Sequence, residues 1–341
     1  MILGICGFGY SGSGAILDLL KESSKCEVCD SFEFSMTYKP DGLEDLEWHI
    51  TQPSRYFSSD SAIRRFIQYK KRIAKRYDQY SNGRFSKLAD EYINKITTIK
   101  WYGSTSVHIY QSSWFEYIFF QMLSRKLRSP FERKVFPIPF VCPPDITMYY
   151  SSISSSSFLD YTIEFVSGFI NSIRKTDRDI LVLDQPFSAN NPQRTMRFFK
   201  SPKAIVVNRD PRDVYLLANK TIGMTANFIP RREVSLFIEY YKGLMSQVVK
   251  DSSENNTLRI NFEDLIYNNR PTIKSICDFI GINDIGNETH FMPEKSINNT
   301  QLFLKYKGFE KEIERISTEL SDYLYPFDSF QTKPTFKSTS F

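Results

Sequence analysis

Histidine and cysteine, the side chains that most often bind transition metals or form disulfides, are scarce in this sequence. It contains three histidines and five cysteines in 341 residues. The cysteines are scattered and odd in number, which excludes a disulfide framework. The C-x-x-C pair of Cys26 and Cys29 has no second pair to complete a zinc site. We therefore expect no metal site.

Long apolar runs are also lacking. The sequence has no stretch of about eighteen apolar residues and no room for a secretion signal before its first expected strand. We therefore expect a cytoplasmic protein without a membrane-spanning helix. The net charge of +5 is too small to indicate a nucleic-acid partner. With 41% hydrophobic and 24% charged residues, the composition is that of a soluble globular protein.

What the sequence does contain is a glycine-rich stretch directly after its first apolar run. Residues 2–6 (ILGIC) predict a buried parallel strand, and residues 7–14 (GFGYSGSG) predict a turn. Ile16, Leu19 and Leu20 then lie on one face of a helix. The backbone N–H groups of such a loop, with the positive end of the helix behind them, favour phosphate binding. We expect an anion site here.

Three kinds of phosphate-binding loop fit this stretch. Residues 7–12 (GFGYSG) satisfy the dinucleotide pattern G-x-G-x-x-G, and Asp30 follows at the distance of a ribose-binding carboxylate. The same residues fit half of the ATP/GTP loop, but Ser13 replaces its lysine. Residues 11–13 (SGS) resemble the loop of sulfotransferases that use 3′-phosphoadenylyl sulfate (PAPS). The loop alone does not decide among the three.

The rest of the chain alternates apolar strands with amphipathic helices, except in its middle. Residues 60–100 predict basic helices whose lysines and arginines, at 70–76, form either a solvated face or a patch for an acidic acceptor. Residues 101–150 are strongly aromatic, 31–47 predict a loop, and the residues from 326 on predict a loose tail. Strands are expected at 26–29, 179–184, 204–208 and 258–261, and helices at 158–174, 234–248, 272–280 and 309–324. This alternation predicts an α/β fold with a parallel sheet.

Two later segments give the pattern a specific family resemblance. AIVVNRDPRDVYLLA (204–218) resembles the 3′-phosphate-binding strand and helix of PAPS-dependent sulfotransferases. LRINFEDLIYN (258–268), followed by TIKSICDFIGI (272–282), resembles their Tyr-Glu-Asp-Leu segment and the next helix. The chain thus resembles a PAPS-dependent sulfotransferase, and a bacterial carbohydrate-type enzyme in particular.

The resemblance implies a three-layer α/β sandwich with a central parallel sheet of the P-loop NTPase type. It implies a single domain over residues 1–325, in which roughly residues 45–175 form a largely helical, aromatic insertion on the acceptor side. Residues 326–341 would be a C-terminal tail.

The resemblance also assigns a nucleotide site. The 5′-phosphosulfate would lie on the glycine loop, the 3′-phosphate would meet Arg209, and a C-terminal clamping segment would follow. Two positions depart from the family: Tyr10 stands where a lysine or arginine is usual, and Leu217 where a serine is usual. The residues expected to bind the nucleotide are Gly9, Tyr10, Ser11, Gly12, Ser13, Gly14, Ala15, Arg209, Lys295 and Ser296.

Sulfuryl transfer needs a base for the acceptor hydroxyl and donors for the leaving oxygens, but in principle no metal. The candidate bases are Glu33, after the second strand, and Asp184, at the end of a later one. We expect Glu33 to be the base, because its loop would lie beside the glycine loop. The flanking Phe32 and Phe34 would also shield it from water. The nucleotide product would be adenosine 3′,5′-bisphosphate.

The aromatic middle of the chain favours a glycan or glycolipid hydroxyl as acceptor. A glycolipid would bring a peripheral contact with a membrane, and the oligomeric state is left open by the sequence. Two other functions fit part of the pattern. One is a non-catalytic nucleotide-binding protein of the same fold, which Tyr10 and Leu217 favour. The other is an NAD(P)-dependent oxidoreductase of the Rossmann type, which explains Asp30 but not Arg209.

Overall fold

The computed structural model describes residues 1–52, 58–103, 145–220, 228–249, 256–283 and 289–330, and the isolated positions 114–115, 118–119, 122, 285 and 334. The chain forms two compact units. Unit 1 comprises Met1–Lys39 and Val166–Phe341, and unit 2 comprises Pro40–Phe165. Unit 1 carries the glycine loop and Arg209, so it is the unit that positions the expected nucleotide site.

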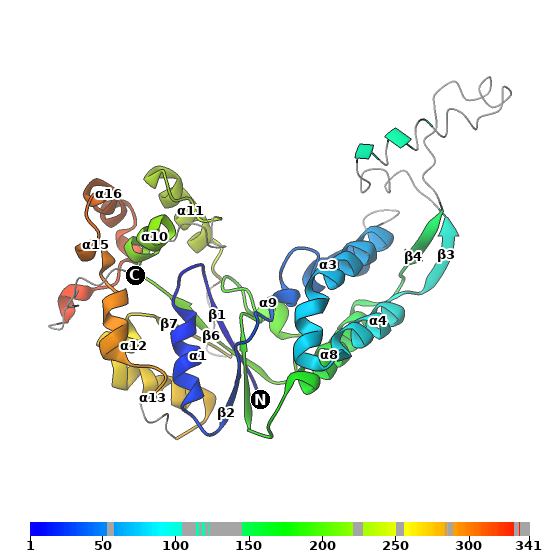
Figure 1. Ribbon diagram of the computed structural model, residues 1–341, viewed down its shortest axis with the longest axis horizontal. Helices are drawn as coiled ribbons and strands as arrows, with labels where there is room; N and C mark the ends of the chain where they lie inside the picture. Colours follow the sequence, from blue (N-terminus) through cyan, green and yellow to red (C-terminus); the bar gives the residue numbers. More distant parts are fainter. Residues whose placement is uncertain are drawn as a thin grey trace. The chain divides into compact units, whose positions relative to one another are not determined.

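In the described residues, unit 1 is built around a parallel sheet of five strands (Figure 1), in the order β2-β5-β1-β6-β7. Ile5 of β1 lies opposite Asp184 on one side and Ile205 on the other. Because all the strands are parallel, the loops that follow them lie at one edge of the sheet. The strands are β1 (Ile2–Gly7), β2 (Cys26–Cys29), β5 (Ile180–Asp184), β6 (Pro202–Asn208) and β7 (Thr257–Asn261).

The central strands carry runs of buried apolar residues, as expected of a sheet with both faces covered. On one face, Leu3 and Ile5 pack against α1 (Ser13–Lys21), α12 (Asp264–Tyr267) and α13 (Asn269–Ile280). Successive side chains of a strand point to opposite faces, so Gly4 faces the other side. A cluster of phenylalanine rings lies there: Phe32, Phe34, Phe169, Phe187 and Phe199.

The helices α10 (Pro211–Lys220), α11 (Val234–Ser246) and α16 (Glu310–Glu319) lie together in unit 1 (Figure 1), and their apolar side chains form a second cluster. They bury Tyr215 and Phe237 between them. α10 begins at a proline, whose fixed φ suits the first helical position. The short helices are α9 (Gln193–Met196), α14 (Pro293–Ser296), α15 (Leu302–Lys305) and the 3₁₀ turns η1 (Ser35–Thr37), η2 (Ile297–Asn299), η3 (Ser321–Tyr323) and η4 (Phe327–Ser329).

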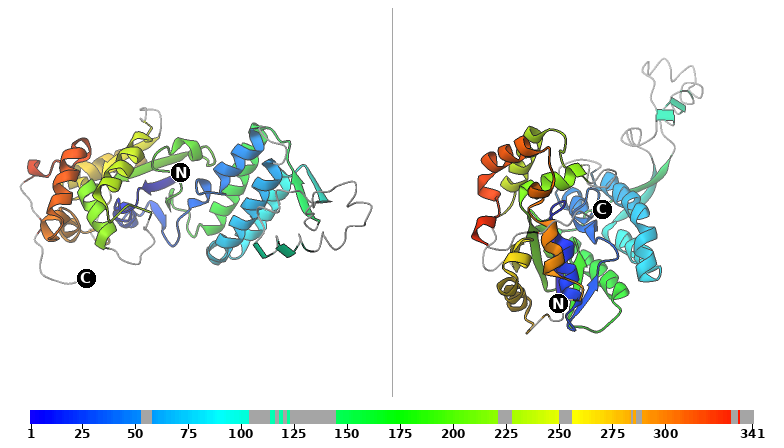
Figure 2. Two further views of the ribbon diagram at one scale, coloured as in Figure 1. Left: turned by 90° about the horizontal axis from the view of Figure 1, so that it is seen from above. Right: turned by 60° about the vertical axis from the view of Figure 1, so that its left-hand side comes forward.

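Unit 2 is mainly helical, and its longer helices lie side by side (Figure 2). In the described residues its longer helices are α2 (Leu43–Thr51), α3 (Ser58–Ser81), α4 (Arg84–Ile96) and the first part of α8 (Ser155–Ile173). The Tyr92 ring stacks on Phe165 with centroids 4.9 Å apart, and its hydroxyl lies 2.9 Å from that of Thr162. An antiparallel pair, β3 (Ile99–Gly103) and β4 (Ile146–Tyr150), completes the described part of the unit.

None of the helices in the described part of the chain, including the 24-residue α3, combines the length and apolarity needed to cross a bilayer.

The strands and long helices expected from the sequence are confirmed, apart from shifts of a few residues at their ends. Residues 31–47 are not all loop, because α2 begins at Leu43 after the turn at Gly42. The chain after residue 326 stays packed further than expected. Phe327 is buried, and its ring lies 5.6 Å from that of Tyr267.

The expected position of the second strand is wrong. β5 lies between β1 and β2, and it hydrogen-bonds to both. Burial explains this order. The side chains of β5 are buried from Ile180 to Leu183, whereas only Cys26 of β2 is buried and Glu27 is partly exposed. A strand with a partly exposed carboxylate is stable at the edge of a sheet, while an apolar strand needs both faces covered.

Substitutions at two glycines test the assigned end of α13 and the helical conformation of α11. Gly281 ends α13 with φ of +78°, and Gly243 lies inside α11; a Cβ at either position would meet no atom within 4 Å. We predict that Gly281→Ala lowers the free energy of unfolding by about 1 kcal/mol, because only glycine adopts this φ without cost. Gly243→Ala should raise it by about 0.5–1 kcal/mol. Urea denaturation measures both, and a stabilised Gly281→Ala variant would contradict the assigned helix end.

Candidate active site

The glycine loop connects β1 to α1 and ends in a helix N-terminus. The N–H of Ser11 donates to the carbonyl of Phe8, and the N–H of Ala15 donates to that of Gly12, both at 3.0 Å. Gly12 has φ of +82° and is followed by Ser13, the first residue of α1. The first N–H groups of a helix have no carbonyl within it to bind, so this turn presents donors to an anion.

Neighbouring side chains fill the space beside three of the loop glycines. A Cβ on Gly7 would lie 2.0 Å from the Oγ of Ser11, and one on Gly12 would lie 2.6 Å from the Phe262 ring. At Gly9 it would lie 2.8 Å from Ile229. Gly14 differs, because no atom lies within 4 Å of the Cβ position there. The loop is thus packed against side chains at Gly7, Gly9 and Gly12, and it is open at the first turn of α1.

Arg209, at the end of β6, is held against this loop. Its Nη1 donates to the carbonyl of Tyr10 at 3.1 Å, and its Nη2 donates to the carbonyl of Asn299. The guanidinium carbon lies 4.8 Å from the centroid of the Phe262 ring, the same ring that supports Gly12. The structure therefore brings together the two parts of the nucleotide site that the sequence predicted, and Phe262, which the sequence did not single out, touches both.

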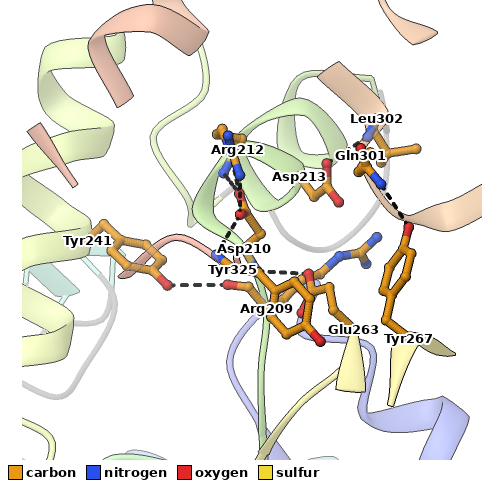
Figure 3. Close-up of polar contacts among 10 residues, drawn as sticks. All are labelled: Arg209, Asp210, Arg212, Asp213, Tyr241, Glu263, Tyr267, Gln301, Leu302 and Tyr325. Carbon is orange, nitrogen blue, oxygen red and sulfur yellow. Dashed lines mark hydrogen bonds and ion pairs between the residues drawn. The ribbon is translucent and has the colours of Figure 1, made fainter. Parts of the chain in front are cut away.

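Buried charged side chains surround Arg209 (Figure 3). The Asp210 carboxylate accepts hydrogen bonds from Arg212, at 2.7–2.9 Å, and from the N–H of Tyr325. The Glu263 Oε1 accepts from the N–H of Asp210 at 3.0 Å, and the Asp213 Oδ1 from that of Leu302 at 2.8 Å. These contacts fix the start of α10 to the segments after β7.

Burial shifts the titration of two of these carboxyls. It raises the pKa of Asp213 to about 7 and that of Glu263 to about 8, although the nearby positive charge of Arg209 acts in the opposite direction. One oxygen of each carboxyl, Asp213 Oδ2 and Glu263 Oε2, has no hydrogen-bond partner among the described residues. A buried oxygen without a donor favours the protonated form.

Gln185, which follows β5, joins the two ends of the glycine loop. Its N–H donates to the carbonyl of Ile5 at 2.8 Å. Its side-chain Oε1 accepts from the N–H of Gly7, and its Nε2 donates to the Oγ of Ser13, each at 3.2 Å. The sequence offered only a weak signal for this role, a glutamine between a strand-ending Asp184 and a proline.

The two candidate bases lie at the same edge of the sheet. Asp184 ends β5 opposite Ile5, and its carbonyl accepts from the N–H of Phe34 at 2.7 Å. The Glu33 side chain is 54% exposed and pairs with Lys39 at 3.0 Å. Phe32 and Phe34 pack into the core, so they do not shield Glu33 as expected. The loop of Glu33 also does not follow a neighbour of β1, because β5 lies between them.

The remaining predicted residues are placed as follows. Lys295 is exposed and Ser296 partly buried in α14, and the segment after them reaches Arg209 through Asn299. Tyr10, with φ of +62°, packs on the cluster of α10, α11 and α16, and Leu217 is partly buried in α10.

These residues fit an anionic nucleotide. The Oγ of Ser11 and the Nε of Arg209 are both buried and find no hydrogen-bond partner within the described residues. They lie in the two elements that the resemblance assigns to the nucleotide. Unpartnered donors at the loop and at its arginine are what an anionic group would satisfy, and the loop is open to an anion at the first turn of α1.

The raised carboxyl pKa values predict a pH dependence of stability. Between about pH 4, where these carboxyls titrate in the unfolded chain, and their folded pKa values, the folded protein binds more protons. Stability should therefore fall as the pH rises from 5 to 8. Glu263→Gln should reduce this fall by at least about 1 kcal/mol, because an amide binds no proton. Urea denaturation at both pH values measures it, with the exposed Glu314→Gln as control. Parallel profiles for wild type and Glu263→Gln would contradict the prediction.

Comparison with known proteins gives the family. A family model described as "Sulfotransferase family" matches residues 5–285. No match was found among curated protein sequences. The sulfotransferase domain of the Synechococcus PCC 7002 olefin synthase is 11% identical with a TM-score of 0.37, over 94% of this chain and 87% of that one.

Two other solved structures are similarly distant. Sulfotransferase STF9 from Mycobacterium avium is 12% identical with a TM-score of 0.38, over 98% of this chain and 78% of that one. The sulfotransferase domain from the curacin biosynthetic pathway is 12% identical with a TM-score of 0.38, over 96% and 98%. The assignment rests on the family match, which runs from β1 to beyond α13. The chain belongs to the sulfotransferase family.

Proposed function

We propose that this sulfotransferase transfers a sulfuryl group from PAPS to a hydroxyl of a carbohydrate or glycolipid acceptor. The observation that supports the donor best is the hydrogen bond from Arg209 to the carbonyl of Tyr10. It joins the glycine loop to the arginine that the family resemblance assigns to the 3′-phosphate. When bound, PAPS supplies a sulfuryl group attached to a phosphate leaving group.

The chain's own residues would hold this nucleotide at two points. The loop of Gly9–Ala15 offers the N–H groups at the start of α1 and the hydroxyl of Ser13 to the 5′ side. Arg209 offers its guanidinium to the 3′-phosphate, since an arginine can bind a phosphate through two parallel hydrogen bonds. Lys295 and Ser296 remain candidates for the 3′ side, because the segment that follows them contacts Arg209 through Asn299.

We propose Asp184 rather than Glu33 as the base that takes the proton of the acceptor hydroxyl. β5 is the neighbour of β1, and Asp184 lies opposite Ile5, two residues before the glycine loop begins. Glu33 lies on the loop after the edge strand and is already paired with Lys39. It stays a candidate, because its neighbour Phe34 is hydrogen-bonded to the carbonyl of Asp184.

The strand order argues against a dinucleotide-binding oxidoreductase. In dinucleotide-binding folds the first and second strands are neighbours, whereas here β5 separates them, and Asp30 is paired with Lys21 at 2.6 Å. The oxidoreductase interpretation is therefore wrong. A non-catalytic nucleotide-binding protein remains a second candidate, because neither Tyr10 nor Leu217 carries the charge or hydroxyl usual at its position.

The acceptor proposal rests on unit 2. Its β3–β4 pair exposes aromatic rings, with Trp101 at 40% and Tyr102 at 79% exposure. Flat rings of this kind pack well on the C–H faces of sugars. We propose that unit 2 contributes acceptor binding and that the enzyme acts in the cytoplasm, where a glycolipid acceptor would place it at a membrane surface.

The donor proposal predicts a preference among nucleotides. Adenosine 3′,5′-bisphosphate should bind much more tightly than AMP, and Arg209→Ala should abolish most of this preference, at a cost of about 1.5–3 kcal/mol. Arg178→Ala is the matched control, because Arg178 also donates to a main-chain carbonyl, that of Cys26, but at the opposite edge of the sheet. Calorimetry measures the affinities. An equal loss for both nucleotides in Arg209→Ala would contradict the 3′-phosphate assignment.

The base proposal predicts a contrast between two isosteric variants. Asp184→Asn should lower kcat by about 10²–10⁴-fold with little change in affinity for adenosine 3′,5′-bisphosphate, while Glu33→Gln should stay within a few-fold of wild type. Asp30→Asn, which removes a carboxylate from the same edge, is the control and should be nearly silent. The reverse pattern would make Glu33 the base. No turnover in wild type with any glycan would favour the non-catalytic alternative.

A further inference from the structure

The side chain of Gln185 can be oriented in only one way against the glycine loop. Its amide faces the main-chain nitrogen of Gly7 on one side and the Oγ of Ser13 on the other, each at 3.2 Å. A main-chain N–H can only donate, so the amide oxygen must face Gly7. The amide NH₂ must therefore face Ser13 and donate to it.

This orientation determines what the Ser13 hydroxyl can do. A hydroxyl has one proton to donate and lone pairs to accept with. Since Ser13 accepts from Gln185, its own proton is left for another acceptor. Ser13 is the first residue of α1, beside the open space at Gly14, where the helix N-terminus favours negative charge. The acceptor best suited to that proton is an anionic oxygen.

The backbone holds Gln185 in this position. Its φ is +51°, a conformation that non-glycine residues rarely adopt, and it precedes Pro186. The N–H of Gln185 is bound to the carbonyl of Ile5 at 2.8 Å. The next residues are packed closely against β1, where a Cβ on Gly4 would lie 2.5 Å from Pro186 and 2.4 Å from Phe187. The main-chain conformation of Gln185 and the packing of the residues after it thus restrain the position of the side-chain amide.

We infer that Gln185 is a positioning residue that makes the Ser13 hydroxyl a donor to the anionic group of the nucleotide. The inference rests on the proposed function, because it takes an anionic sulfuryl donor as the ligand of the loop. It adds a specific requirement: the residue after β5 must donate to Ser13 while it accepts from Gly7. An amide does both, whereas a carboxylate can only accept.

Two variants of Gln185 separate this role from simple support of the loop. Gln185→Glu keeps an acceptor for Gly7, but its carboxylate also accepts the hydrogen bond of the Ser13 hydroxyl and adds a negative charge. Gln185→Met has similar size and binds neither group, which leaves the Ser13 hydroxyl free to turn. We expect Gln185→Glu to weaken binding of adenosine 3′,5′-bisphosphate about 10- to 100-fold and Gln185→Met only a few-fold. Simple support predicts the opposite order, because only Glu retains hydrogen bonds.

Gln193→Glu is the matched control for the added charge. The Gln193 side chain also donates to a hydroxyl, that of Thr257, at 3.2 Å. Thr257 begins β7, so this contact lies at the amino end of the sheet, away from the glycine loop. We expect this variant to bind adenosine 3′,5′-bisphosphate as wild type does, and thermal unfolding of every variant reports whether it is folded.

Two further measurements complete the test. In a Ser13→Ala background, Gln185→Glu should cost several-fold less affinity than in wild type, because only the charge remains to act. Lowering the pH from 8 to about 4.5, near the ordinary pKa of a glutamate, should partly restore binding in Gln185→Glu relative to wild type, since a protonated carboxyl again donates to Ser13. Additive effects of the two substitutions, or a larger loss in Gln185→Met than in Gln185→Glu, would overturn the role of Gln185 alone. Failure of wild type to bind adenosine 3′,5′-bisphosphate would overturn the proposed donor, and this inference with it.

Discussion

The hydrogen bond from Arg209 to the carbonyl of Tyr10 is the contact on which the arrangement of the site depends. It joins the end of β6 to the loop after β1, and the same guanidinium reaches the carbonyl of Asn299 far along the chain. Below it, the ring of Phe262 contacts both the guanidinium and Gly12. Three segments from distant parts of the sequence are thus ordered by one side chain and one ring.

This arrangement places the guanidinium of Arg209 where little water reaches it. Arg209 is only 8% exposed, and Asp210, Asp213 and Glu263 around it are fully or almost fully buried. Asp210 forms a buried ion pair with Arg212 at 2.7 Å, and such a pair adds little net stability because each ion loses its hydration. It does penalise any rearrangement that leaves one partner unpaired, so this cluster contributes more to the geometry of the start of α10 than to the total free energy of unfolding.

Local patterns predicted most of unit 1, because each strand and helix carries its own hydrophobic period and its own end signals. The helix expected to end at residue 280 does end there, and Gly281 follows it with φ of +78°. The order of the strands could not be predicted this way, since it depends on which strands are buried on both faces. For the same reason Gln185 was missed as part of the loop: its partner Gly7 lies 178 residues away in the sequence. The role of Arg209 in the site was predicted from the family resemblance, whereas the contacts of Phe262 were predicted neither from local patterns nor from the resemblance.

The position of β1 between β5 and β6 has a consequence for synthesis of the chain. β1 is synthesised before both of its partners, which lie beyond residue 179. At a synthesis rate of about 5–20 residues per second, roughly ten seconds or longer pass between the synthesis of β1 and that of β5. During that time an apolar strand with two unpaired edges has no native partner to pair with. The nascent chain therefore exposes an apolar strand with unpaired edges well before the contact between the glycine loop and Arg209 can form.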